Sequence, residues 1–264
     1  MRIVVLVKHV PEPTATWRFT DDHRLDRDGV EGRLSQLDEY AIEQAMKLVE
    51  GGLEGGTAAE VTCLTMGPAK AAEGLRKALA MGGDKGVHIV DDALRGSDAL
   101  STSLVLAKAV ERLGFDLVIC GMASTDAEMS VVPSMLADRL GVPQATNASD
   151  LRLGGTSVTV HRDTDTATEE VVASLPAVVS VTDQSGEPRY PTFKAIMAAR
   201  KKPVETWSLA DLGVSPGDVG FAGAATAVRD AQPRPPRTAG TVIADGSGDT
   251  AAALADFLAA NKFI

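Results

Sequence analysis

Apolar and polar positions in the first half of the chain follow two alternating patterns. Short continuous apolar runs, rich in β-branched residues, are typical of strands buried in a parallel sheet. Between them, apolar residues recur every three or four positions, which predicts amphipathic helices. The strand-like runs lie at 2–8, 60–66, 86–90 and 115–120, and the helix-like segments at 37–49, 72–80, 98–113 and about 128–140. This repetition predicts an α/β fold in which a mostly parallel sheet carries helices on both faces.

The pattern changes after residue 143. Three short, half-polar runs separated by Gly or Thr turns predict a β meander at one edge of the sheet. The meander strands are expected at 150–153, 157–162 and 169–175, followed by a buried strand at 177–181, a turn-rich loop at 182–191 and a short basic helix at 192–202. We therefore expect an α/β domain over residues 1–202.

From residue 203 onward the chain is irregular and rich in Pro and Gly. Such a stretch cannot form a core alone, so residues 203–264 are predicted to be an extended C-terminal arm that ends in a helix at 250–261. A long ordered arm needs a surface on which to lie. We expect a partner chain to provide that surface.

A long segment, residues 10–35, separates the first predicted strand from the first predicted helix. Loops between a strand and a helix usually have about 2–6 residues, so this one is expected to be functional or to carry its own hairpin. Residues 18–20 and 24–26 are the candidate strands of that hairpin.

Composition narrows the class of protein. The 264 residues are 44% hydrophobic and 23% charged, which fits a globular chain and excludes a disordered or collagen-like one. No apolar run approaches the roughly 18 residues of a membrane span, and a strand follows directly after Met1, so we expect no leader peptide and a cytoplasmic location. The net charge of −10 argues against nucleic acid as a partner, because phosphate contacts require a basic face. The basic cluster at 200–202 is too short to change this.

Side chains that carry chemistry are sparse. The four histidines lie in separate segments without metal-ligand spacing, and no GxSxG nucleophile motif is present. Cys63 and Cys120 each fall in a predicted buried strand, so we expect two buried reduced thiols rather than a disulfide or a zinc site. We therefore expect no metal site and no catalytic residue.

Three predicted strand ends are candidates for ligand binding, because open α/β sheets bind ligands at the carboxyl ends of their strands. They lie at 6–8, 65–68 and 120–126, and neither a dinucleotide GxGxxG motif nor a P-loop accompanies them. The last segment offers backbone N–H groups and two hydroxyls at a helix N-terminus, which suits an anion. The alternative is a capping box, Thr125 with Glu128, that only begins the helix. Asp126 and Glu128 would repel a phosphate unless they face away from it.

Several segments together resemble the β subunit of electron transfer flavoprotein. They are VKHVP (7–11), ALAMGGDK (78–85), DLVICG (116–121), LPAVVS (175–180), EPRYPTF (187–193) and IMAARKK (196–202). Their order and spacing match from residue 1 to the terminal arm, and the block at 187–202 is the most specific. One departure is the apolar stretch at 129–132, where many members of the family are more polar.

The resemblance implies one half of an αβ heterodimer that carries electrons and has no substrate turnover of its own. FAD would be held mainly by the α subunit, and the β subunit would cover one side of the flavin and bind a structural AMP in a Rossmann-like domain. By position, the AMP-binding residues would be Leu6, Ser35, Gln36, Leu37, Asp38, Met66, Gly121, Met122, Ala123, Ser124, Thr125, Asp126, Ala127, Glu128, Met129, Ser130, Val131 and Val132.

The resemblance also implies a recognition loop that docks on acyl-CoA or related flavin dehydrogenases through one apolar anchor, Phe193. The alternative is that Phe193 is an ordinary core residue. The partner-binding residues would be Asp163, Glu187, Pro188, Arg189, Tyr190, Phe193, Ile196, Met197, Arg200, Lys201 and Lys202. Among them, Asp163 would pair with an arginine of the α subunit, and the three basic residues at 200–202 would steer acidic partners.

Electrons would pass from the dehydrogenases through FAD to a membrane quinone reductase. Two alternatives stay open: an electron-bifurcating subunit with a second FAD in place of AMP, and a stand-alone adenine-nucleotide sensor that reuses the fold. The terminal arm distinguishes the sensor from a heterodimer subunit, because a stand-alone sensor does not need such an arm.

Overall fold

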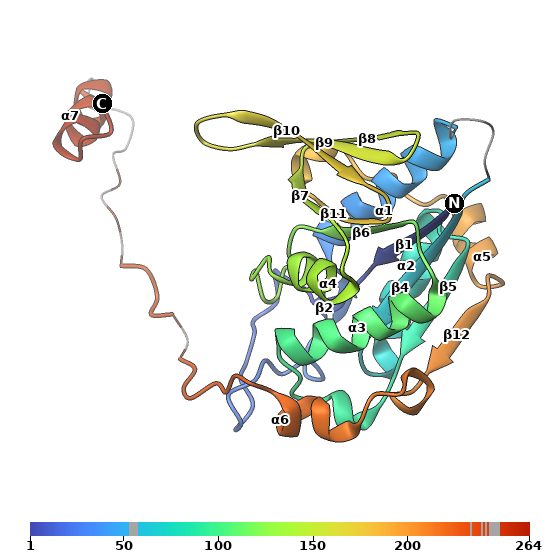
Figure 1. Cartoon of the computed structure of the whole chain (residues 1–264). Helices are drawn as coiled ribbons and strands as arrows, with labels where there is room; N and C mark the ends of the chain where they lie inside the picture. The colour runs from blue at the N-terminus through green and yellow to red at the C-terminus, as the bar shows by residue number, and fades with distance from the viewer. Residues whose placement is uncertain (53–57, 233, 239, 241, 243–248) are drawn as a thin grey trace. The chain divides into compact units, whose positions relative to one another are not determined.

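The computed structural model describes residues 1–52, 58–232, 234–238, 240, 242 and 249–264 (Figure 1). It divides the chain into two units, Met1–Arg229 and Asp230–Ile264. The first unit contains the three sheets and the core, and the described residues of the second contain one helix, α7.

The centre of the first unit is a seven-stranded sheet in the order β12-β5-β4-β1-β6-β11-β7, in which every neighbouring pair is parallel. Its strands are β1 (Arg2–Leu6), β4 (Glu60–Met66), β5 (Lys85–Ile89), β6 (Leu117–Gly121), β7 (Gln144–Ala148), β11 (Ala177–Val181) and β12 (Val204–Trp207). The five strands from β5 to β11 are nearly continuous apolar runs because helices cover both faces. The predicted parallel α/β fold is confirmed.

Alternate residues of β1 point into two separate cores. Ile3 and Val5 pack with α1 (Gln36–Glu50) and α2 (Ala72–Met81), and Val4 packs with α3 (Ala99–Leu113) and α4 (Val132–Leu140). These two helix pairs therefore lie on opposite faces of the sheet (Figure 1). Short 3₁₀ turns precede two of the helices: η2 (Ala69–Ala71) before α2 and η3 (Asp92–Leu94) before α3.

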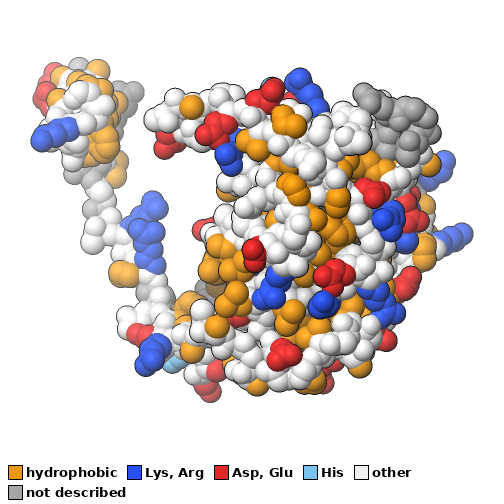
Figure 2. Space-filling model, viewed as in Figure 1, with side chains coloured by type: hydrophobic (Ala, Val, Ile, Leu, Met, Phe, Trp, Pro, Cys, Tyr) orange, Lys and Arg blue, Asp and Glu red, His pale blue; other side chains and the backbone are white. Residues whose placement is uncertain are grey.

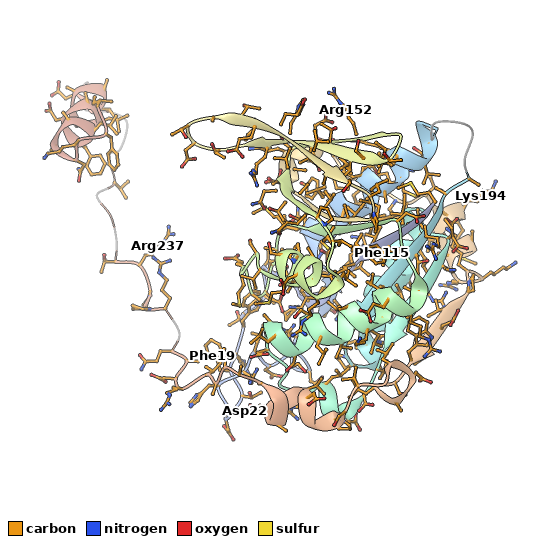
Figure 3. All side chains as sticks on the ribbon, viewed as in Figure 1. Phe19, Asp22, Phe115, Arg152, Lys194 and Arg237 are labelled. Atoms are coloured by element: carbon orange, nitrogen blue, oxygen red, sulfur yellow. The ribbon has the colours of Figure 1, made fainter. Side chains whose placement is uncertain are left out.

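The long segment after β1 folds back on itself. β2 (His9–Pro11) pairs antiparallel with β3 (Gly32–Leu34), and an isolated antiparallel bridge joins Phe19 to Leu25. The Thr20 N–H donates to the Arg24 carbonyl at 2.7 Å, which supports the same turn. The predicted hairpin is confirmed, and Figure 3 shows Phe19 and Asp22 in this loop.

The predicted meander is also confirmed, but as a sheet of its own. β8 (Asp150–Gly154), β9 (Ser157–Asp163) and β10 (Thr168–Ser174) pair antiparallel, and β9 contacts the edge strand β7 of the main sheet. β7 was not predicted, because its sequence QATNA has no large apolar residue. It pairs with β11 and forms one edge of the main sheet.

The start of the fourth predicted helix was wrong. α4 begins at Val132, not near residue 128, and residues 128–131 form a loop. Glu128 and Ser130 have φ angles of 50° and 54°, in the left-handed region that no helix continues through. The proposed capping box of Thr125 with Glu128 is therefore wrong as well.

The prediction that the chain becomes irregular at residue 203 was also wrong for its first part. Val204–Trp207 is a strand of the main sheet, and Trp207, Leu209 and Leu212 are buried in the core beside α3. η5 (Ala210–Leu212), η6 (Pro216–Asp218) and α6 (Gly220–Gly223) follow within the same unit. The second unit begins only at Asp230.

The second unit contains the predicted terminal helix as α7 (Thr250–Ala260). Its composition is strongly apolar, yet Leu254 and Phe257 are both 51% exposed. Figure 2 shows apolar side chains on the surface of this helix. An apolar helix without a buried face within its own unit lacks the packing that ordinarily stabilises helices in proteins.

Candidate functional site

Three strand ends meet where the strand order of the main sheet reverses. β4 and β5 lie on one side of β1, whereas β6 lies on its other side. Such a switch point is the place where open parallel sheets bind ligands, at the carboxyl ends of the strands. Leu6, Met66 and Gly121 end these strands, as the sequence predicted.

The start of α1 lies directly against the end of β6. A Cβ atom on Gly121 would lie 2.7 Å from Oδ1 of Asp38 and 2.8 Å from the carbonyl oxygen of Leu37. No real Cβ contact is that short, so only glycine fits at this position. The close approach brings Ser35 and Asp38, at the beginning of α1, to the switch point.

Two cations share one buried carboxylate at this edge, which we call the strand-end cluster (Lys8, Arg27, Asp126). The Lys8 ammonium donates to Oδ1 of Asp126 at 2.9 Å and to the hydroxyl of Ser124 at 3.2 Å. The Arg27 guanidinium pairs with the other oxygen, Oδ2. The Asp126 side chain is 0% exposed, whereas Lys8 and Arg27 remain partly open to solvent.

The strand-end cluster removes the expected repulsion between Asp126 and a phosphate. Burial raises the pKa of this carboxyl, but the charges of Lys8 and Arg27 outweigh burial and lower the pKa to about 2. Two positive charges then face one negative charge, and the cluster carries a net positive charge. An anion bound there would be attracted rather than repelled.

Asp38 is the second buried carboxyl at this edge. The backbone N–H of Lys8 donates to its Oδ2 at 2.8 Å. Burial is the largest influence on its pKa and raises it to about 7, against the lowering effect of that hydrogen bond and the Lys8 charge. Asp38 therefore changes its charge near neutral pH.

Three buried hydroxyls at this edge have no hydrogen-bond partner within the described residues. They are Oγ of Ser35, immediately before α1, Oγ1 of Thr125, after β6, and Oγ1 of Thr65, near the end of β4. Buried polar groups are almost always paired, and an unpaired one costs about 1–3 kcal/mol. Hydroxyls beside a cationic cluster suit the phosphate and ribose oxygens of a nucleotide.

The structure brings some of the predicted nucleotide residues together and leaves others apart. Leu6, Ser35, Asp38 and Gly121 are buried at the edge, and Ser124 and Asp126 join them through Lys8. The remaining predicted positions are half-buried or exposed. The half-buried ones are Leu37, Met66, Met122, Ala123, Thr125, Val131 and Val132, and the exposed ones are Gln36, Ala127, Glu128, Met129 and Ser130.

The site residues predicted by position did not include Lys8 and Arg27. Lys8 lies within the candidate strand end at 6–8, two residues after the end of β1, so its position was a usable signal. Arg27 lies in the long loop, 99 residues before Asp126, and nothing in its neighbourhood marks it.

Arg189 binds the first part of the predicted recognition loop (residues 182–202) to α1. The Arg189 guanidinium pairs with Oε2 of Glu43 at 2.7 Å and with Oε1 of Glu50 at 2.5 Å, and these two acids lie two turns apart on α1. The hydrogen bonds that Arg189 donates to the carboxylates of Glu50 and Glu43 raise the pKa of Arg189 further. Arg189 was predicted to contact a partner, but these bonds give it a role within the chain.

α5 (Phe193–Ala199) lies within the recognition loop and exposes its apolar side chains. Thr192 caps it, since its Oγ1 accepts from the N–H of Ala195 at 3.2 Å. Phe193 is 79% exposed, Tyr190 is 95% exposed, and Ile196 and Met197 are 42% exposed. The alternative that Phe193 is a core residue is therefore wrong.

The three basic residues after α5 differ in their surroundings. The Lys202 ammonium donates to three carbonyls at the end of α2, those of Leu79 at 2.9 Å, Gly82 at 3.3 Å and Gly83 at 2.7 Å. The prediction that Lys202 steers partners therefore conflicts with its place inside the chain. Arg200 and Lys201 are exposed, and no ion pair to either is seen in the described part of the chain.

Asp163 ends β9 and is exposed. The hydroxyl of Ser149 donates to its Oδ2 at 2.6 Å and that of Thr168 to its Oδ1 at 2.7 Å. These two hydrogen bonds lower the pKa of Asp163, and the bond from Ser149 has the larger effect. The carboxylate is thus fixed in direction, while its pairing with a partner stays a prediction.

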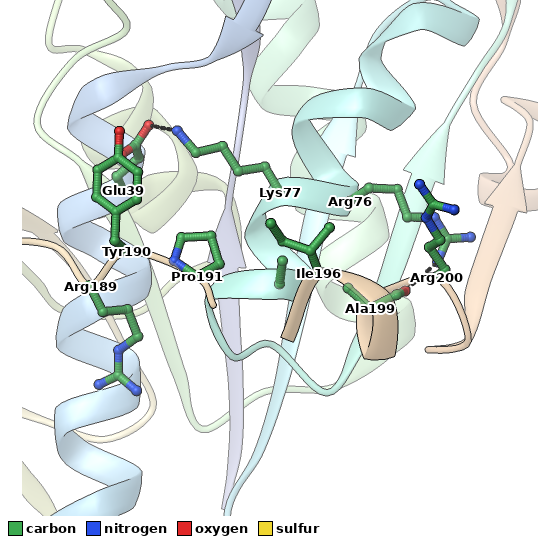
Figure 4. Close-up of a pocket in the computed structure, with 10 residues that line it drawn as sticks. Glu39, Arg76, Lys77, Arg189, Tyr190, Pro191, Ile196, Ala199 and Arg200 are labelled. Atoms are coloured by element: carbon green, nitrogen blue, oxygen red, sulfur yellow. Dashed lines mark hydrogen bonds and ion pairs between the residues drawn. The ribbon is translucent and has the colours of Figure 1, made fainter. Parts of the chain in front are cut away.

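A cavity of about 590 Å³ lies beside α5 and not at the strand ends (Figure 4). It opens between α1, α2 and the recognition loop. Its lining consists of Glu39, Arg76, Lys77, Ala80, Arg189, Tyr190, Pro191, Ile196, Ala199 and Arg200. We assign the nucleotide-like features to the strand ends nonetheless, because the buried charges and the unpaired hydroxyls are there.

Other candidate chemistry is limited within the described residues. No group of three His, Cys, Asp or Glu side chains there is placed to hold a metal ion, and no helix there is long and apolar enough to cross a membrane. Cys63 and Cys120 are free and buried, as predicted. Burial raises the pKa of the Cys63 thiol to about 12, so it is not a reactive thiolate.

Comparison with known proteins gives a consistent picture. The model of the electron transfer flavoprotein domain matches residues 22–212. The chain is 42% identical to an electron transfer flavoprotein subunit beta of Mycobacterium leprae, over 99% of both chains. It is 31% identical to the subunit of that name in Megasphaera elsdenii, over 92% of this chain and 91% of the other. It is also 32% identical to the caffeyl-CoA reductase-Etf complex subunit CarD of Acetobacterium woodii, over 92% of both.

Proposed function

The chain belongs to the electron transfer flavoprotein family, among its β subunits, and from that premise we propose that it forms a heterodimer with an α subunit. In this proposal FAD is held mainly by the α subunit, and this chain covers one side of the flavin. Electrons enter from acyl-CoA or related flavin dehydrogenases and leave to a membrane quinone reductase. The chain positions and shields the flavin and turns over no substrate itself.

The nucleotide of this chain is proposed to be AMP, bound at the switch point of the main sheet. The observation that carries this proposal is the strand-end cluster together with the unpaired hydroxyls of Ser35 and Thr125. Lys8 and Arg27 would attract the phosphate, and the two hydroxyls would donate to its oxygens or to the ribose. The site would stabilise the fold around α1 rather than take part in redox chemistry.

The partner surfaces are proposed to be α7 and the exposed apolar side chains of α5. Leu254 and Phe257 of α7 are half-exposed, which supports a surface of the α subunit as the place where this helix packs. Phe193 is proposed as the apolar anchor for the dehydrogenase, since an exposed aromatic side chain on a fixed short helix is typical of a binding hot spot.

Counting nucleotides in the purified heterodimer tests this function. One FAD and one AMP per heterodimer are expected. Two flavins without AMP would instead support the electron-bifurcating alternative. A flavin-free full chain that is compact and has no affinity for an α subunit would support the nucleotide sensor.

Variants of the hydroxyl groups test where the nucleotide lies. Thr125→Val keeps the shape of the side chain and removes its hydroxyl, so we expect AMP content to fall. Thr159→Val on β9, away from the strand ends, is the matched control and should retain full AMP content. Equal AMP content in both variants would place the nucleotide elsewhere.

A further inference from the structure

The exposed apolar row on α5 continues into the cavity of about 590 Å³ beside it. The row consists of Tyr190, Phe193, Ile196 and Met197, and we call it the α5 face. Tyr190 and Ile196 belong both to this face and to the cavity lining. The exposed apolar row and the cavity therefore share two side chains, both drawn in Figure 4, and the cavity combines apolar and charged lining residues.

The floor of the cavity is apolar and rigid. Ala80 of α2 and Ala199 of α5 are both buried and face it, with Pro191 beside them. Arg76 fixes the end of α5 to α2, because its Nη1 donates to the carbonyl of Ala199 at 2.9 Å and to that of Lys202 at 3.1 Å. The space between α2 and α5 is thus preformed.

The charged residues on the rim are not equally available. Lys77 pairs with Glu39 at 2.5 Å, so these two charges largely cancel. Arg200 also lines the cavity, and no ion pair to it is seen within the described residues. Lys201 and Lys194 add exposed positive charge nearby, and Figure 3 shows Lys194 pointing away from the body of the unit.

The charge of this region contrasts with that of the chain. The whole chain has a net charge of −10, yet residues 188–204 contain five basic residues and no acidic one. Two of the five, Arg189 and Lys202, are engaged within the chain, which leaves Lys194, Arg200 and Lys201 as exposed positive charge. A binding partner that fits this region is therefore acidic. Because the apolar face extends beyond the cavity, a small carboxylate in the cavity would leave Phe193 and Met197 uncovered, whereas a protein surface would cover both.

We propose that the cavity is a socket for a side chain of the docking dehydrogenase. The partner inserts one apolar side chain, carried on an acidic segment, between α2 and α5, while Phe193 contacts the partner's own surface. A carboxylate of that segment pairs with Arg200 at the rim. This inference rests on the proposed docking function and gives docking a second, reciprocal anchor.

Steady-state electron transfer tests the socket. The probe is the full αβ complex, titrated into an acyl-CoA dehydrogenase that is reduced by its acyl-CoA substrate. Ala80→Leu fills the socket from α2 without touching the α5 face, so the KM for the complex should rise by about fivefold or more, the effect of losing a contact worth over about 1 kcal/mol. The kcat should stay within about twofold, because the flavin is untouched.

Ala198→Leu is the matched control. Ala198 lies on α5, is exposed and does not line the cavity, so the same substitution there should leave the KM unchanged. Arg200→Glu and Lys201→Glu form a second pair that reverses exposed charges. Both weaken long-range attraction, but Arg200→Glu should raise the KM several-fold more, because only Arg200 lines the socket.

The outcomes separate the socket from docking itself. If Ala80→Leu melts like the parent and leaves the KM unchanged, or if Arg200→Glu and Lys201→Glu are equivalent, the socket is wrong. If Phe193→Ser still raises the KM in that case, docking through α5 stands without the socket. If Phe193→Ser also has no effect, the docking function proposed above fails.

Discussion

The strand-end cluster and the surroundings of the α5 face both carry cations, but the two regions use their cations differently. At the strand ends, Lys8 and Arg27 are held by Asp126, whose side chain is fully buried. Beside the α5 face, Arg200 and Lys201 are exposed, and no carboxylate is seen to pair with them in the described part of the chain. The difference indicates an internal ligand in the first region and an external partner in the second.

The two regions also lack different kinds of contact. At the strand ends the unpaired groups are hydroxyls, among them those of Ser35 and Thr125. On the α5 face the uncovered groups are apolar, with Phe193 and Tyr190 the most exposed. The strand ends therefore lack hydrogen-bond partners, whereas the α5 face lacks an apolar surface to cover it. Substitutions at the strand ends should change stability, and those on the α5 face should change only docking.

The largest effect on stability is expected from Gly121→Ala. Its Cβ would lie 2.8 Å from the Leu37 carbonyl oxygen, a backbone atom that cannot move without displacing the start of α1. The free energy of unfolding should fall by about 3 kcal/mol, the upper range for overpacking. Urea unfolding of the full chain measures it. Gly154→Ala, with no atom within 4 Å of its Cβ, is the control and should change by less than about 0.5 kcal/mol.

Asp38→Asn should produce the next largest effect, and it should depend on pH. Between the ordinary pKa of Asp and about 7, the folded chain keeps a proton on Asp38 that the unfolded chain has released, so stability falls as pH rises. The Asn variant lacks this titration. Its stability relative to the parent should therefore increase by about 2 kcal/mol between pH 5 and pH 7. If the stability difference between the Asn variant and the parent is the same at pH 5 and at pH 7, the raised pKa of Asp38 is contradicted.

The sequence predicted the parts of the fold whose pattern is local. Buried strands such as Leu117–Gly121 have an apolar run that no other structure explains as well. β7 and β12 were not predicted, because their sequences mix apolar and polar residues and their pairing is set by distant strands. The start of α4 was misplaced because Thr125 and Glu128 have the spacing of a capping box, and the left-handed φ of Glu128 is not visible in its residue type.

In the candidate site, too, the features that follow from local pattern were predicted and those that depend on distant contacts were not. The strand ends Leu6, Met66 and Gly121 followed from the rule for parallel sheets, which depends only on strand order. The partnership of Arg27 with Asp126 depends on how a long loop folds back, which no local pattern encodes. Likewise Arg189 and Lys202 were assigned to partners by the resemblance to the recognition loop of the family, whereas their long side chains turn inward to α1 and α2.

Lys8→Met sharpens the difference between engaged and exposed cations. The buried Asp126 carboxylate would keep only Arg27, so the free energy of unfolding at pH 7 should fall by about 1 kcal/mol, a value reduced because Lys8 is partly exposed. Lys201→Met removes a cation with no seen partner and should change stability by less than about 0.5 kcal/mol. Chemical unfolding of both variants measures the contrast. Equal losses would mean that the strand-end cluster contributes nothing beyond an ordinary surface charge.

The smallest effect on stability is expected from Phe193→Ser, although the side chain is one of the largest in the chain. An aromatic residue buried in a core costs about 3–5 kcal/mol when it is truncated. Phe193 is 79% exposed and makes little contact to lose, so its replacement should change the free energy of unfolding by less than about 0.5 kcal/mol. Trp207→Ser, in the core beside α3, provides the opposite case and should cost several times more. A large loss for Phe193→Ser would show that the ring packs against the chain itself, and the α5 face would then belong to the fold rather than to a partner.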